Sequence, residues 1–210
     1  MESWLQTISH TAHAMSPWEL AAVICAIAYL VLAVRENVWC WLFAFISTAI
    51  YTVLFRDVSL LMDSALNVYY MAMAVFGWYQ WTHGSTGPDG EPHTLAIRTM
   101  SIRQHGLIIV AITLLSGISG YLLSEHSGAA WPYVDSFTTW SSVITTYLVT
   151  RKYLQNWLYW IVIDIVSVPL YIDRGLTLTA LLFVIYIVIA VIGYVKWRKH
   201  FYATGQHVAA

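Results

Sequence analysis

The sequence predicts an all-α integral membrane protein, with seven transmembrane helices in a 3+1+3 arrangement of two parallel repeats. Three observations predict this fold class: seven apolar segments, basic residues gathered in alternate connections, and a similarity between the two halves of the chain. The composition agrees, because 59% of the 210 residues are hydrophobic and 10% are charged, against roughly 25% charged residues in a soluble domain. The formal net charge of −1 provides no basic surface for nucleic acid.

Each apolar segment is long enough, or nearly so, for the roughly 20 residues that a transmembrane helix needs. The connections between them are short, except for the polar segment 82–103, whose Gly-Pro-Asp-Gly motif predicts a flexible loop. The first Lys or Arg is Arg35, so a cleavable signal peptide with a basic start is not expected. The seven segments are 18–34, 38–55, 58–81, 105–123, 132–150, 156–172 and 175–197.

The basic residues predict the orientation of the chain. If the spans alternate, eight Lys and Arg residues share one face, and only Arg56 and Arg174 lie on the other. The richer face is predicted to be cytoplasmic, because cytoplasmic loops carry the excess of Lys and Arg. The predicted parts are an extracytoplasmic N-terminus (1–17), a first three-helix bundle (18–81), a cytoplasmic loop and linker helix (82–131), a second three-helix bundle (132–197) and a cytoplasmic tail (198–210).

The two halves of the chain resemble each other. Segments 37–41 and 156–160 both hold Asn and Trp four residues apart, and segments 77–81 and 193–197 both hold Gly and Trp four residues apart. The offset stays between 116 and 120 residues. Because a single linking span separates the two sets of three spans, both sets run in the same direction. Transporters built from repeats bind their substrate near the membrane midplane, at the interface between the repeats.

A stripe of aromatic and polar side chains crosses the sixth predicted span. With helical spacing, Trp160, Asp164, Ser167 and Tyr171 fall on one face. Asp164 lies about eight residues into the span, roughly 12 Å deep, where a charged side chain usually faces a cavity, a partner or a ligand. This stripe suits a solute with a positively charged ring. The alternatives are a structural aspartate bonded to a neighbouring helix, or a carboxyl that couples transport to protons.

Other polar and aromatic side chains at similar depths are candidate contacts for the same solute. The amide of Asn67 suits a ribose or a base edge, and the hydroxyls of Thr139 and Ser142 suit a hydroxyl-rich solute. The ring of Trp41, which the repeat pairs with Trp160, would attract a cation. Helix packing is the alternative for the hydroxyls, and anchoring at the membrane interface is the alternative for the tryptophans. These candidates are Trp41, Tyr51, Asn67, Tyr70, Thr139, Trp140 and Ser142.

Several residues are expected to have structural roles only. Gly77 is expected to permit close contact between helices, and Cys25 and Cys40 are expected to be small buried hydrophobes. We expect no catalytic residues, metal site or cofactor, because no His lies deep inside a span. Seven tryptophans are expected to anchor the chain at the interfaces: Trp4, Trp18, Trp39, Trp81, Trp131, Trp157 and Trp197.

Several motifs resemble those of bacterial nicotinamide riboside transporters of the PnuC type. The resemblance covers about residues 35–199. Its motifs are Gly77-Trp78-Tyr79 with Trp81, Asp135-Ser136, Thr150-Arg151-Lys152-Tyr153, Asn156-Trp157 with Trp160, and Val166-Ser167-Val168.

The resemblance implies a 3+1+3 fold related to SWEET-type sugar transporters, and a homotrimeric assembly. It also implies that nicotinamide riboside enters across the bacterial inner membrane by facilitated diffusion and is retained by a cytoplasmic kinase. Related members carry thiamine, riboflavin or deoxynucleosides, and carriers of nicotinamide riboside tend to have Asn where this chain has Asp164, and Gln where it has Asn67. Asp164 suits cationic nicotinamide riboside or thiamine better than neutral riboflavin, and ion-coupled transport is the less favoured alternative.

Overall fold

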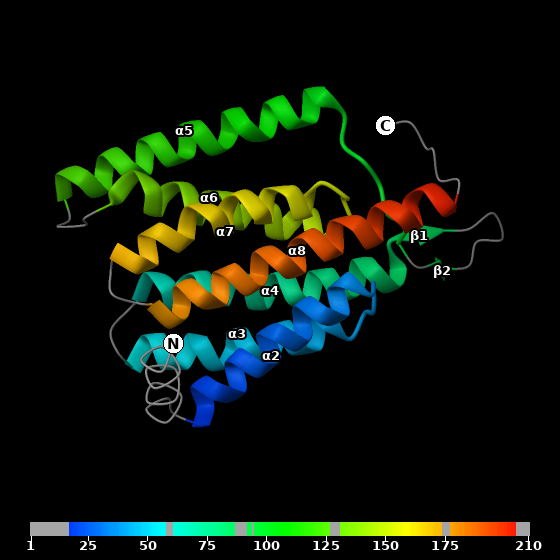
Figure 1. Cartoon of the computed structure of the whole chain (residues 1–210), viewed down its shortest axis with the longest axis horizontal. Helices are drawn as coiled ribbons and strands as arrows, with labels where there is room; N and C mark the ends of the chain where they lie inside the picture. The colour runs from blue at the N-terminus through cyan, green and yellow to red at the C-terminus, as the bar shows by residue number, and fades with distance from the viewer. Residues whose placement is uncertain are drawn as a thin grey trace, which may run out of the picture. The chain divides into compact units, whose positions relative to one another are not determined.

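The computed structural model describes residues 17–57, 61–86, 92–93, 95–126, 131–173 and 177–204. Apart from Pro17, the predicted extracytoplasmic N-terminus lies outside these residues, as do positions 205–210 of the predicted tail. The described residues form seven helices (Figure 1): α2 (Pro17–Val34), α3 (Cys40–Asp57), α4 (Leu61–His83), α5 (Ile102–His126), α6 (Pro132–Thr150), α7 (Asn156–Asp173) and α8 (Thr177–Ala203).

The helices coincide closely with the predicted spans. Six of the seven begin and end within three residues of a predicted span, and α8 continues to Ala203, so the first part of the predicted tail is helical. Among the described residues, α2, α5 and residues 179–203 of α8 are long and apolar enough to cross a membrane, with mean hydropathies of 2.1, 2.1 and 2.3. The other helices carry more polar residues, and their membrane crossing remains a prediction.

The chain folds into two compact units, Met1–Thr94 and Leu95–Ala210. In the first unit, α2 packs against α3, and α3 packs against α4. The buried hydroxyl of Ser47 on α3 donates a hydrogen bond to the carbonyl of Ala22 on α2, at 2.9 Å. Small hydroxyl residues let apolar helices approach closely, and this bond joins the two backbones directly.

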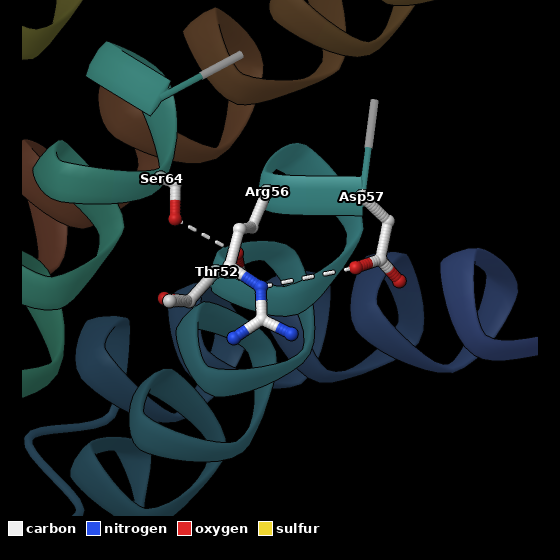
Figure 2. Close-up of polar contacts among 4 residues, drawn as sticks. All are labelled: Thr52, Arg56, Asp57 and Ser64. Carbon is white, nitrogen blue, oxygen red and sulfur yellow. Dashed lines mark hydrogen bonds and ion pairs between the residues drawn. The ribbon is translucent and has the colours of Figure 1, made fainter. Parts of the chain in front are cut away.

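The contact between α3 and α4 has a similar bond near the other end of α3. The Ser64 hydroxyl donates to the carbonyl of Thr52 at 2.8 Å (Figure 2). Arg56 and Asp57 lie beside this bond, with Nε and Oδ1 3.9 Å apart. Their side chains are 71% and 61% exposed, so the ion pair contributes little to stability.

In the second unit, α5 packs along α6, and α7 packs against both α6 and α8. The helices α5 and α6 approach closely at Gly120, where an added Cβ would lie 3.0 Å from the Cα of Tyr133. Nearby, the indole Nε1 of Trp140 donates to the hydroxyl of Ser119 at 2.9 Å. These contacts fix the predicted linker helix to the first helix of the second bundle.

The polar segment between α4 and α5 is more ordered than predicted. A two-stranded antiparallel sheet, β1 (Ser85–Thr86) and β2 (Pro92–His93), follows α4. Residues 95–100, here called the strap, then pair with the turn between α6 and α7. The backbone N–H of Arg98 donates to the carbonyl of Lys152 at 3.0 Å, and the N–H of Leu154 donates to the carbonyl of Arg98 at 2.8 Å.

Side chains also hold the strap in place. Leu95, Ile97 and Met100 are 2%, 4% and 8% exposed, and the Arg98 guanidinium lies 5.8 Å from the centre of the Tyr153 ring. The prediction of a flexible loop is therefore wrong for residues 95–100, because three buried apolar side chains and two backbone hydrogen bonds fix them.

The same unusual turn follows α2 in the first unit and α6 in the second. Glu36 after α2 and Lys152 after α6 are the only described non-glycine residues with positive φ, at 55° and 51°. In each turn, the N–H of the left-handed residue bonds back three residues and the next N–H bonds back five, all at 3.0 Å. This is the Schellman motif, which usually has glycine at the left-handed position. The two positions are 116 residues apart.

The same offset relates two aromatic clusters, here called the clamps. In the first, the Trp41 and Trp81 rings meet edge to face with centroids 5.3 Å apart, and the Trp41 ring also lies against Gly77. In the second, Trp157 and Trp197 meet edge to face at 5.4 Å, and the Trp157 ring lies against Gly193 in the same way. Corresponding residues are again 116 positions apart.

The clamps support the predicted repeat and correct its register. In the clamps, Trp41 corresponds to Trp157 and not to Trp160. The predicted pairing aligned Asn37 with Asn156, which differs from the register of the clamps by three residues. Trp81, Trp157 and Trp197 are 2%, 2% and 0% exposed. Their predicted role as interface anchors is therefore wrong, since they are enclosed by protein. The expected role of Gly77 in close helix contact is confirmed.

Candidate solute-binding site

Helix α7 carries a buried carboxylate with no bonding partner in the described part of the chain. Asp164 is 3% exposed, and it makes no hydrogen bond or ion pair with any other described residue. An unpaired buried charge costs several kcal/mol, so such a group rarely persists for packing alone. The arrangement leaves the carboxylate free for a ligand, a cation or a proton.

Three hydroxyl groups on α6 have the same property, those of Ser136, Ser141 and Thr145. Ser141 and Thr145 are 1% and 0% exposed, and the oxygens of both side chains lack a hydrogen-bond partner among the described residues. Both helices extend from the turn at 151–155, so Ser141 and Asp164 are each roughly 17 Å from its centre at 1.5 Å per residue. Unpaired acceptor and donor groups therefore lie at one depth on neighbouring helices.

Sequence reasoning did not choose Ser141 or Thr145 as site residues. It chose Ser142 and Thr139, of which Ser142 is 9% exposed and Thr139 is exposed. The i, i+4 spacing of Ser141 and Thr145 places them on one face of the helix, but Ser142 and Thr146 have the same spacing, so the sequence did not distinguish the two pairs. Trp140, also chosen, is half-buried and bonded to Ser119, so its indole N–H is directed at α5.

The remaining predicted residues of α7 flank Asp164 as their spacing required. Trp160 is half-buried one turn before it. Ser167 is 3% exposed, and its hydroxyl donates to the carbonyl of Ile163 at 2.8 Å. Tyr171 is half-buried, with its ring 5.0 Å from that of Phe183 on α8. Asp164 is thus the member of the stripe that the surrounding described residues leave unpaired.

The other four predicted residues belong to the first unit. Asn67 on α4 is 9% exposed, and Tyr70, one turn further along, is half-buried with its ring 5.7 Å from that of Tyr69. Trp41 is 2% exposed inside the first clamp, and its indole N–H has no acceptor among the described residues. Tyr51 on α3 is half-buried. Each unit therefore presents its own set of predicted contacts.

The side chains of the candidate site are suited to binding a solute. In the described residues, no cluster of His, Cys, Asp or Glu could hold a metal ion. A carboxylate, hydroxyls and an indole ring provide charge, hydrogen bonds and a stacking surface.

Comparison with known proteins identifies the family. A family model described as nicotinamide mononucleotide transporter matches residues 16–199. The chain belongs to this family. Its relatives are transporters, so this member of the nicotinamide mononucleotide transporter family is a membrane transporter and not an enzyme.

Three relatives illustrate the range of the family. The nicotinamide riboside transporter PnuC of Escherichia coli (strain K12) is 24% identical over 200 residues, covering 85% of this chain and 84% of the relative. PnuC of Neisseria mucosa is 27% identical over 187 residues, covering 85% and 70%. The riboflavin/roseoflavin transporter RibM of Streptomyces davaonensis is 24% identical over 181 residues, covering 85% and 83%.

A solved structure has the same fold. The crystal structure of the vitamin B3 transporter PnuC matches with a TM-score of 0.71 and 24% identity, covering 93% of this chain and 86% of the other.

Proposed function

We propose that this transporter carries a vitamin-type solute with a positively charged ring, and that this solute is nicotinamide riboside. The solute would cross the bacterial inner membrane by facilitated diffusion, and phosphorylation by a cytoplasmic kinase would retain it. The single observation that supports a cationic solute is the buried carboxylate of Asp164, which has no described partner. A pyridinium ring would supply the missing positive charge.

The neighbours of Asp164 suit the rest of such a molecule. The Trp160 ring lies one turn away on the same face of α7 and would contribute roughly 1–2 kcal/mol against a cationic ring once water is excluded. The unpaired hydroxyls of Ser141 and Thr145 would bond to ribose hydroxyls. Asn67 and Tyr70 of the first unit are the proposed contacts from the other repeat.

The proposal includes a 3+1+3 arrangement, with α2–α4 and α6–α8 as parallel repeats and α5 as the linker. The equivalent clamps and helix-ending turns, 116 residues apart, support it. With this arrangement, the positive-inside rule predicts an N-terminus outside and a C-terminus in the cytoplasm. The homotrimer remains a prediction, which the mass of the purified protein in detergent would test.

Two other substrate classes are alternatives. Thiamine also carries a fixed positive charge on a ring, so Asp164 suits it for the same reason. Riboflavin is neutral, and the similarity to RibM is the observation that favours it; deoxynucleosides share the hydroxyl contacts but lack the charge. Proton-coupled transport is the alternative mechanism, because a buried carboxyl can also carry a proton.

The decisive experiment is uptake of labelled nicotinamide riboside into proteoliposomes without an ion gradient. We expect saturable equilibration of the label, competition by unlabelled nicotinamide riboside, and little competition by riboflavin. Stronger competition by thiamine would reassign the substrate. Uptake that requires a proton gradient would contradict facilitated diffusion.

A further inference from the structure

The exposed side chains on one face of α8 change from apolar to basic toward the C-terminal end of the helix. Exposed side chains spaced three or four residues apart are apolar from Leu181 to Val195, where the exposed fractions are 43% and 44%. At 1.5 Å per residue, this apolar stripe is roughly 21 Å long. The same line of the helix then continues with Arg198 and Lys199, both exposed, and ends at Tyr202. The stripe is therefore apolar first, then cationic, then aromatic.

The cationic part of the stripe borders a shallow, open and mostly apolar hollow of about 370 Å³ on the surface of α8. Its walls are Val195, Arg198, Lys199 and Tyr202, which share a face because their spacing is i, i+3, i+4 and i+7. The Arg198 guanidinium lies 5.9 Å from the centre of the Tyr202 ring. In the described part of the chain, no carboxylate forms an ion pair with Arg198 or Lys199. Two cations thus face one hollow, and their charge is not neutralised by the described protein.

We propose that this hollow binds the phosphate group of an anionic diacyl phospholipid, whose acyl chains lie along the apolar stripe. The stripe is long enough for one whole leaflet, about 15 Å, and part of the next in a hydrocarbon core about 30 Å thick, and the cations begin where the apolar residues end. Basic residues beside a membrane helix attract anionic lipids, and a tyrosine at that level is typical of the interface.

The apolar stripe distinguishes a lipid from a free anion. Arg198 and Lys199 are exposed, and exposed charge pairs gain little because water competes for both charges. An acyl chain adds apolar burial that a free phosphate ion lacks. The proposal concerns the outer face of α8 alone, so it does not depend on which solute the transporter carries.

The chain offers a matched control at Lys196. This residue is also exposed on α8 and has the same charge. It lies about 110° around the helix from the midpoint between Arg198 and Lys199, and it is not part of the hollow. Lys196→Gln therefore removes one charge at a similar depth without changing the proposed site.

Native mass spectrometry of the full-length protein in detergent tests the proposal. Phosphatidylglycerol and phosphatidylcholine with identical acyl chains would be supplied at equal concentrations, and the bound fraction of each would be measured. We expect phosphatidylglycerol to be retained preferentially. The preference should fall about fivefold for R198Q or K199Q and about 25-fold for the double variant, while K196Q keeps it.

Three outcomes would overturn the proposal: equal retention of the two lipids, an equal loss in K196Q, or displacement of phosphatidylglycerol by an equal concentration of inorganic phosphate. The last outcome would indicate a site for free anions. The single variants carry the test should the double variant unfold, and thermal unfolding checks that each is folded.

Discussion

Gly193 lies against the face of a fixed indole ring, so replacing it with alanine should destabilise the second unit. A Cβ at this position would lie 2.8 Å from three ring carbons of Trp157. That ring is 2% exposed and meets Trp197 at an interplanar angle of 90°, so it has little room to move. Overpacking of this kind costs about 1–3 kcal/mol. For a protein of this size, each kcal/mol lowers the melting temperature by roughly 2–4 °C.

The assay is thermal unfolding of the detergent-solubilised protein, followed by tryptophan fluorescence. Gly193→Ala should melt about 2–12 °C below the unmodified protein. Gly77→Ala should behave alike, because Gly77 faces Trp41 in the first clamp. Gly117→Ala is the control, since an added Cβ there meets no atom of the described residues within 4 Å and alanine favours the helix by about 0.5–1 kcal/mol. If Gly193→Ala were as stable as Gly117→Ala, the clamp would not be a tightly packed contact.

Three further predictions follow from particular contacts. Ile97→Asp should lower the melting temperature of the protein, because it places a charge at a strap position whose side chain is only 4% exposed. An unchanged melting temperature would show that the burial of this side chain does not stabilise the fold. Trp140→Phe should cost about 1 kcal/mol of stability by removing the bond to Ser119 while leaving the affinity for nicotinamide riboside unchanged, since phenylalanine keeps an aromatic ring at this predicted contact; a lower affinity would show that the indole itself is needed to bind the solute. Thr145→Val should leave stability unchanged or raised, because its hydroxyl has no hydrogen-bond partner among the described residues, and should weaken solute binding by about fivefold to tenfold. Thr138→Val, which removes a hydroxyl bonded to the carbonyl of Val134, is the control and should not weaken binding.

Much of the fold could be predicted from local properties of the sequence. The length of an apolar segment limits where a membrane helix can begin and end, and α6 has the predicted bounds. The burial of Asp164 and Ser167 also followed from spacing, because the 3.6-residue period places them on one face.

The errors concern contacts between distant segments. The strap was predicted to be flexible because it lies in the polar segment 82–103, which contains a Gly-Pro-Asp-Gly motif. Leu95, Ile97 and Met100 are nevertheless buried, and the strap pairs with a turn more than fifty residues away. Local composition contains no signal for such a pairing. The alternating apolar residues at 95 and 97 were the available sign, since one face of an extended segment was apolar.

The tryptophans show a second limit. Belt and core tryptophans look alike in a sequence, because an apolar helix has both lipid-facing and protein-facing sides. The glycines four residues before Trp81 and Trp197 marked the protein-facing side, because each leaves space for another indole ring. Unpaired hydroxyls such as Thr145 could not be recognised either, since the sequence does not say which hydroxyls bond to their own helix.

The most direct test of the proposed function is a binding titration that compares Asp164→Asn with the unmodified protein. Nicotinamide riboside and riboflavin would be titrated separately while tryptophan fluorescence is followed, with Asp57→Asn as the control because that carboxylate is exposed. We expect Asp164→Asn to weaken nicotinamide riboside binding about 30-fold or more, as removing one partner of a buried charge pair costs about 2–5 kcal/mol, and to leave the weak binding of riboflavin unaffected. Equal affinities of Asp164→Asn and the unmodified protein for nicotinamide riboside would contradict a role for this carboxylate in binding the cation.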